Sequence, residues 1–129
     1  MNTAINPFII QDERGLMGVV DFQLLPFTPK RFFWLTNVPN GESRGGHAHR
    51  SCEQFIVCLS GSIICDATDL HGVRSQTKLE PGASYYLPIF TWLDITGFTT
   101  DANVGVFASE TYNEEEYIRS RDEFNSLSM

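Results

Sequence analysis

The chain has 129 residues, of which 42% are hydrophobic and 19% charged, and these values are typical of one folded soluble domain rather than a disordered segment. Sixteen acidic and nine basic residues give a net charge of −7, which argues against general nucleic-acid binding because such binding needs a basic surface. No apolar run is long enough to span a membrane.

Short β-rich segments separated by turn signals follow one another along most of the chain. Pro39-Asn40-Gly41, Ser60-Gly61-Ser62 and Pro81-Gly82 are the clearest of these turns. The expected strands cover residues 16–24, 31–38, 54–59, 62–68, 73–79, 83–87, 91–98 and 103–109. Many short strands at this spacing predict an all-β fold, either a sandwich or a barrel.

The C-terminal segment is the one part of the sequence with a helical pattern. Asn113 is a suitable N-cap, and Glu114–Glu116 would place acidic side chains, exposed to solvent, in the first turn of the helix. The residues that follow at helical spacing are Tyr117, Ile118, Arg121 and Phe124. We therefore expect a short C-terminal helix, with Tyr112 and Tyr117 packing it against the strands.

The three cysteines are Cys52, Cys58 and Cys65, and none of them forms a Cys-x-x-Cys pair. An odd number of cysteines, with no signal peptide recognised before them, favours reduced thiols that act as small core residues. The expected location is the cytoplasm.

His47-Ala48-His49 is the most informative motif of the sequence. If the backbone is extended, side chains at i and i+2 point the same way, so both imidazoles face one side of a strand. Imidazole titrates near neutral pH, and such a pair can therefore bind a metal or transfer protons.

The segment around this pair resembles the first motif of the cupins, which are jelly-roll β-barrel proteins. Five residues separate Gly41 from His47, and Gly61 lies at the expected distance after the pair. Gln54 stands where the motif has Glu, with its side chain expected to point inward and that of Glu53 outward. Gly82 and Pro88 match the second motif, but Leu93 stands where that motif supplies a histidine ligand. Two imidazoles rarely hold a divalent ion, so we expect no metal.

Further matches make the chain similar to the WxcM-like sugar-nucleotide 3,4-ketoisomerases over nearly its whole length. They are Lys30-Arg31-Phe32-Phe33, the block Arg44-Gly45-Gly46-His47-Ala48-His49-Arg50, then Glu53-Gln54, Gly61-Ser62, and Ala108-Ser109-Glu110-x-Tyr112-x-Glu114-x-x-Tyr117-Ile118-Arg119. The resemblance implies one cupin domain over residues 1–129, a homodimer, and no cofactor. It also implies a substrate, a dTDP-linked 4-keto-6-deoxyhexose, whose carbonyl moves from C4 to C3 in deoxysugar biosynthesis.

This resemblance makes His47 and His49 the catalytic candidates. Removal of the C3 proton followed by reprotonation at C4 needs an acid/base pair but no redox group. We assign the C3 proton to His49 and the O4 or C4 side to His47, with the reverse assignment open.

Further residues are candidates for binding the substrate. The amide of Gln54 can donate to the developing enediolate. The guanidinium groups of Arg44 and Arg31 match diphosphate oxygens. Three aromatic residues, Trp34, Tyr86 and Trp92, can stack on the base or the sugar, although core packing explains each of them as well.

Two positions depart from the family pattern. Thr36 stands where some members have tyrosine, and Leu93 stands where some have histidine. These differences leave open a sugar-nucleotide-binding cupin without activity, and a related epimerase acting on the same ketosugar. A metal-dependent cupin enzyme is a third alternative.

Overall fold

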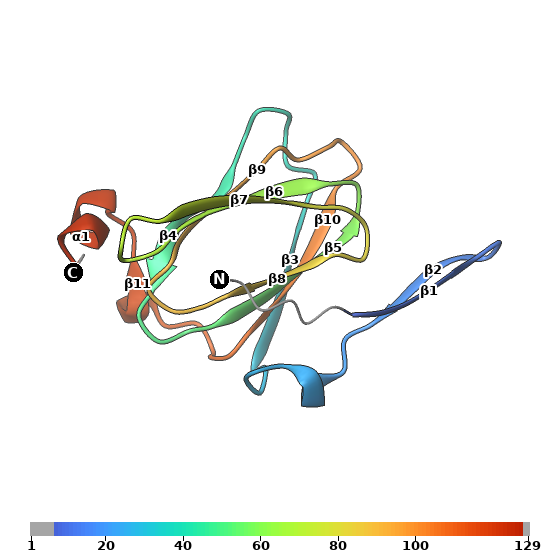
Figure 1. Ribbon diagram of the computed structural model, residues 1–129, viewed down its shortest axis with the longest axis horizontal. Coiled ribbons are helices and arrows are strands. Elements are labelled where there is room, and N and C mark those ends of the chain that lie inside the picture. Colours follow the sequence, from blue (N-terminus) through green and yellow to red (C-terminus); the bar gives the residue numbers. More distant parts are fainter. Residues whose placement is uncertain (1–6, 128–129) are drawn as a thin grey trace.

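A computed structural model describes residues 7–127, and its centre is a sandwich of two antiparallel sheets (Figure 1). One sheet has the strand order β3 (Arg31–Thr36), β10 (Asn103–Ala108), β5 (Gln54–Ser60) and β8 (Ser84–Leu87). The other has the order β11 (Tyr117–Ile118), β4 (Arg44–His49), β9 (Trp92–Thr96), β6 (Ile63–Thr68) and β7 (Arg74–Leu79). The predicted all-β fold with a short C-terminal helix is confirmed, in its sandwich form.

Alternation along the strands decides which side chains fill the space between the sheets. Phe33 and Leu35 of β3 point inward, as do Leu93 and Ile95 of β9, and all four belong to the core cluster or pack against it. Cys58 and Cys65 are free thiols in the same cluster, as predicted. Because Arg31 and Gln54 share a strand face with such core residues, the same alternation turns both toward the interior at one end of the sandwich.

Strand β4 brings the two histidines to this end of the sandwich. Its pairing with β9 shifts register between Gly45 and His47, and Gly45 has a φ of +94°. A Cβ at Gly45 would lie 2.7 Å from the carbonyl oxygen of Leu93, so only glycine fits this bulge. The bulge sets the face on which His47 and His49 lie.

The C-terminal segment differs from the single helix that was predicted. Asn113 caps a 3-10 turn, Glu114–Glu116, and Tyr117–Ile118 then pairs with β4 as strand β11. The α-helix, α1 (Arg121–Ser126), begins only after a new cap at Ser120. Phe124 of α1 packs with Ala48, Trp92 and Ile118 on the outer face of the second sheet.

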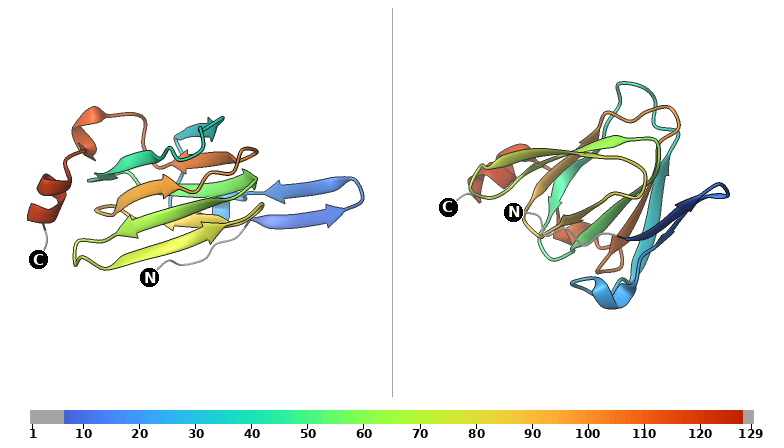
Figure 2. Two further views of the ribbon diagram at one scale, coloured as in Figure 1. Left: turned by 90° about the horizontal axis from the view of Figure 1, so that it is seen from above. Right: turned by 45° about the vertical axis from the view of Figure 1, so that its right-hand side comes forward.

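A two-stranded hairpin, β1 (Phe8–Asp12) and β2 (Gly15–Val19), extends away from the sandwich (Figure 2). Every residue of both strands is exposed, although several are large and apolar. The predicted strand over residues 16–24 is only partly correct, because Phe22–Leu24 forms a 3-10 turn. Within residues 7–127, no helix has the length and apolar composition needed to cross a bilayer.

Candidate active site

A cleft of about 520 Å³ opens at the end of the sandwich to which β4 brings the histidines. Strands β3, β4 and β5, the loop before β4 and the C-terminal segment contribute to its wall. The lining residues are Arg31, Phe32, Phe33, Ser43, Arg44, Gly45, His47, Gln54, Tyr112, Tyr117 and Arg119. The structure therefore brings together Arg31, Arg44, His47 and Gln54, four of the residues that the sequence singles out.

His47 is the imidazole that lines the cleft directly. Its ring meets the rings of His49 and Tyr117 edge-on, with centroid distances of 4.9 and 5.0 Å. Burial, the neighbouring His49 and the charge of Arg119 lower the pKa of His47 from 6.5 to about 4. The ring is thus neutral at pH 7 and can accept a proton from a bound molecule.

His49 lies beneath this surface and is only 1% exposed. Its Nδ1 lies 2.5 Å from a carboxylate oxygen of Glu116, and its Nε2 lies 3.4 Å from the amide nitrogen of Gln54. Burial lowers the pKa of His49, and the carboxylate of Glu116 offsets only part of that effect. His49 therefore reaches the cleft through its neighbours His47 and Gln54.

Three arginines line the cleft of this acidic protein. Arg44 is exposed at its rim. Arg31 donates to the Tyr117 hydroxyl at 3.5 Å, and its guanidinium packs against the Phe33 ring. Arg119 donates two hydrogen bonds to Glu114 and lies 4.4 Å from the centroid of the Tyr117 ring. Such a cluster suits a phosphorylated ligand.

The three predicted aromatic contacts lie away from this cleft. Each of these residues is next to an inward-facing residue of its strand, so alternation points all three outward: Trp34 follows Phe33, Tyr86 follows Tyr85, and Trp92 precedes Leu93. Trp34 is 65% exposed, whereas Trp92 packs against Phe124 outside the second sheet. Tyr86 donates to Glu53 at 2.5 Å on the outer face of the first sheet, which agrees with the expected outward direction of Glu53.

The two positions that depart from the family pattern also lie outside the cleft lining. Leu93 is buried in the core opposite His47, with which it pairs between β4 and β9. Thr36 is exposed near the end of β3 and donates to the side chain of Asn103.

The C-terminal segment supplies site residues that are not among the candidates predicted from the sequence. Tyr112, Tyr117 and Arg119 line the cleft. Glu116 was predicted to be solvated, and this was wrong, because it is 6% exposed and paired with His49. The reason is that residues 117–118 pair with β4 instead of continuing a helix. The available signal was the C-terminal block of the family resemblance, which contains both tyrosines and the arginine.

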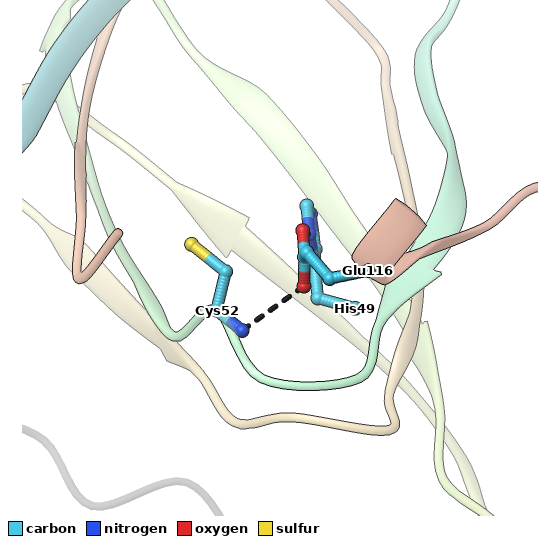
Figure 3. A group of neighbouring side chains, drawn as sticks. All are labelled: His49, Cys52 and Glu116. Carbon is cyan, nitrogen blue, oxygen red and sulfur yellow. Dashed lines mark hydrogen bonds and ion pairs between the residues drawn. The ribbon is translucent and has the colours of Figure 1, made fainter. Parts of the chain in front are cut away.

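Figure 3 shows His49, Cys52 and Glu116, whose potential ligand atoms all lie within 4.8 Å of one another. Their present contacts do not suit a divalent ion. One Glu116 oxygen accepts from the backbone amides of Ser51 and Cys52, and the other faces His49 Nδ1. The guanidinium of Arg31 also lies 3.8 Å from the Cys52 sulfur, where it would repel a cation. The cupin metal position fits no better, because Leu93 offers no ligand atom.

Comparison with known proteins identifies the group to which this architecture belongs. The family model described as "FdtA: WxcM-like, C-terminal" matches residues 1–129. The chain is 34% identical, over 124 residues, to a TDP-4-oxo-6-deoxy-alpha-D-glucose-3,4-oxoisomerase of Aneurinibacillus thermoaerophilus, with 95% of this chain and 89% of that protein covered.

Two solved structures extend this likeness to the fold. One is a His-to-Asn variant of a 3,4-ketoisomerase from Thermoanaerobacterium thermosaccharolyticum in complex with TDP-4-keto-6-deoxyglucose, with a TM-score of 0.91, 26% identity and coverage of 98% and 93% of the two chains. The other, a 3,4-ketoisomerase from Helicobacter canadensis, has a TM-score of 0.88, 26% identity and coverage of 98% and 96%. The chain therefore belongs to the FdtA family, whose description is "WxcM-like, C-terminal".

Proposed function

We propose that this protein is a 3,4-ketoisomerase that moves the carbonyl of a dTDP-linked 4-keto-6-deoxyhexose from C4 to C3 in deoxysugar biosynthesis. The observation that carries the proposal is the adjacent pair His47 and His49 at an arginine-rich cleft, in a chain of this family. Its relative of 34% identity is named for the same change in a TDP-linked sugar.

The reaction needs a base for the C3 proton and a proton source for C4. His47 lines the cleft and is neutral at pH 7, which supports it as the group that removes the C3 proton. His49 is then the second acid/base group, which takes up a proton and returns it while the enediolate forms and is consumed. This order is the reverse of the one expected from the sequence, which gives the C3 proton to His49, and the position of His47 in the cleft supports it. Acid/base groups of this kind contribute about 10²–10⁴-fold in rate.

The remaining cleft residues suit the charge of the substrate and of the intermediate. Gln54 lines the cleft and can donate its amide to the enediolate oxygen. Arg44 and Arg31 are our candidates for the diphosphate, and Arg119 joins them. Trp34, Tyr86 and Trp92 have no part in this proposal, because their side chains lie elsewhere.

We propose that the active form is a homodimer. The hairpin β1–β2 exposes Phe8 and Met17, with exposed fractions of 66% and 54%. The outer face of the first sheet exposes Phe32 and Trp34 in the same way. A second copy of the chain would cover such apolar surface. Light scattering coupled to size-exclusion chromatography should give twice the mass of the 129-residue chain; a monomer mass would contradict the dimer.

We also propose one cupin domain and a cytoplasmic location. The core cluster includes strands of both sheets, which supports one domain. Cys52, Cys58 and Cys65 are free, and unpaired thiols of this kind are typical of a reducing compartment.

The decisive experiment is incubation with dTDP-4-keto-6-deoxyglucose in heavy water, followed by NMR of the product. We expect a 3-keto sugar with deuterium at C4. Recovery of unchanged ligand together with a thermal shift would indicate a binding protein, and a 4-keto product with inverted stereochemistry would indicate an epimerase. Either result would contradict the proposed ketoisomerase function.

A further inference from the structure

Glu116 is a buried carboxylate whose two oxygens have different partners. It ends the 3-10 turn that precedes β11 and is 6% exposed. Oε1 accepts hydrogen bonds from the backbone amides of Ser51 and Cys52, at 3.2 and 3.0 Å. Oε2 lies 2.5 Å from Nδ1 of His49. The backbone of the β4–β5 connection therefore fixes the carboxylate, and the carboxylate in turn faces one nitrogen of one imidazole.

The charge states of this pair follow from their surroundings. Burial favours the neutral acid, but His49 and the two backbone amides hold the pKa of Glu116 below its usual value. Burial lowers the pKa of His49 more than Glu116 raises it. Arg31 and Arg119 act in the same direction as burial, since each disfavours an imidazolium. At pH 7, a neutral His49 therefore faces an ionised carboxylate.

A neutral imidazole has one N–H, and an ionised carboxylate can only accept. The proton of His49 must accordingly lie on Nδ1, where it is donated to Glu116. This leaves the lone pair on Nε2, which lies 3.4 Å from the amide nitrogen of Gln54, a residue of the cleft. The rings of His47 and Tyr117 lie next to His49, with centroids 4.9 and 4.5 Å away.

We propose that Glu116 is a positioning residue that holds His49 in the tautomer with Nδ1 protonated and Nε2 free to accept a proton. The proposal rests on the proposed ketoisomerase function. When Nε2 takes up a proton during the reaction, the carboxylate stabilises the imidazolium that forms, and the proton leaves again from Nε2. Glu116 keeps its charge throughout and does not touch the substrate. The role resembles that of the carboxylate that orients histidine in hydrolase triads.

The substitution Glu116→Gln tests this role because it keeps the shape of the side chain. The two backbone amides need an acceptor, so the new amide oxygen is expected to face them, and its NH₂ group then faces Nδ1 of His49. That arrangement requires the opposite tautomer, with Nε2 protonated. We expect kcat to fall by about 10²–10⁴-fold with little change in KM. Two-bond ¹H–¹⁵N spectra should show the protonated nitrogen of His49 change from Nδ1 to Nε2.

The matched control is Glu110→Gln. Glu110 accepts from the hydroxyl of Ser51, and so contacts the same connection, but it has no contact with His49. This variant should keep both the wild-type kcat and the wild-type tautomer. The proposal is overturned if folded Glu116→Gln keeps its kcat, or loses kcat without a change of tautomer.

Wild-type spectra provide a test that does not depend on folding of the variant. At pH 7 they should show Nδ1 of His49 protonated, and an Nε2–H signal would overturn the proposal. If the wild-type protein does not convert the ketosugar, the proposed ketoisomerase function is excluded. This measurement still shows which nitrogen of His49 is protonated. If the wild-type protein converts the ketosugar and Glu116→Gln has the same kcat, only the positioning role of Glu116 is excluded.

Discussion

Tyr117 pairs with His49 across the β11–β4 ladder, and the centroids of their rings lie 4.5 Å apart. The same tyrosine ring contacts His47. The two-residue strand β11 therefore places one aromatic ring against both imidazoles, and the C-terminal segment is part of the site.

The first prediction concerns this ring. Tyr117→Ala removes the surface that holds both imidazoles, and we expect kcat to fall by about 10²-fold, as small displacements of reacting groups can cause. Tyr117→Phe keeps the ring and loses only the hydroxyl, which accepts from Arg31 at 3.5 Å, so kcat should change little. Steady-state kinetics of both folded variants checks this. Equal kcat in Tyr117→Ala and the wild type would contradict it.

The second prediction is a pH dependence. The base form of His47 is present above its pKa, which is lowered from 6.5 to about 4. Lowering the pH protonates the base, so kcat/KM should stay level from neutral pH down to about 5 and fall below that. A fall centred near the ordinary histidine value would contradict this assignment.

Arg119 is one cause of this low pKa, and Arg119→Gln should therefore move the acid limb of kcat/KM to higher pH. Arg50→Gln is the control, because Arg50 pairs with Glu123 away from the cleft. A limb that stays in place in Arg119→Gln would show that the arginine charge does not act on His47.

The third prediction separates binding from chemistry. Arg44 lies at the exposed rim of the cleft and has no contact with either imidazole among the described hydrogen bonds and ring contacts. Loss of a charge-assisted contact to the diphosphate in Arg44→Ala should raise KM by about 10–100-fold and leave kcat nearly unchanged. Arg74→Ala serves as the control, since Arg74 pairs with Asp66 on another strand pair. An unchanged KM in Arg44→Ala would show that Arg44 does not bind the substrate.

Strand periodicity allowed the fold to be predicted well, because inward and outward positions alternate and turn residues interrupt them. The bounds of β5 to β10 agree with the expected strands to within a few residues. The same periodicity places Trp34, Tyr86 and Trp92 on outward-facing positions. Their residue type alone suggests stacking on a ligand, but residue type does not determine which face a side chain occupies.

Glu116 could not be predicted from local pattern. The run Glu114–Glu116 after Asn113 has the composition of a helix first turn, and Asn113 does cap a turn there. What buries Glu116 is the pairing of residues 117–118 with a strand about 70 positions earlier, a tertiary contact that overrides local preference.

The fourth prediction is that activity does not depend on a metal. Gln54 and Leu93 replace the carboxylate and imidazole of the cupin metal site, and the contacts of Cys52 and Glu116 are directed to hydrogen bonding. Extended dialysis against a chelator should leave kcat unchanged. Loss of activity that is restored by one added divalent ion would contradict metal independence.

The fifth prediction concerns the turn at Gly61, which ends the histidine motif and joins β5 to β6. Gly61 has a φ of +65°, and a Cβ there would lie 2.6 Å from Cα of Ala102. Gly72 has a similar φ of +79°, but a Cβ at that position would meet nothing within 4 Å. Gly72→Ala should therefore lower the free energy of unfolding by about 1–2 kcal/mol, from backbone strain alone.

Gly61→Ala should lower the free energy of unfolding by a further ~1–3 kcal/mol, because the backbone of Ala102 must move as well as the turn. Urea unfolding of the two variants measures the difference directly. Because the strain is the same in kind, the comparison isolates the packing of the β5–β6 turn against residues 99–102. Equal free energies of unfolding for the two variants would show that this turn can relax without cost.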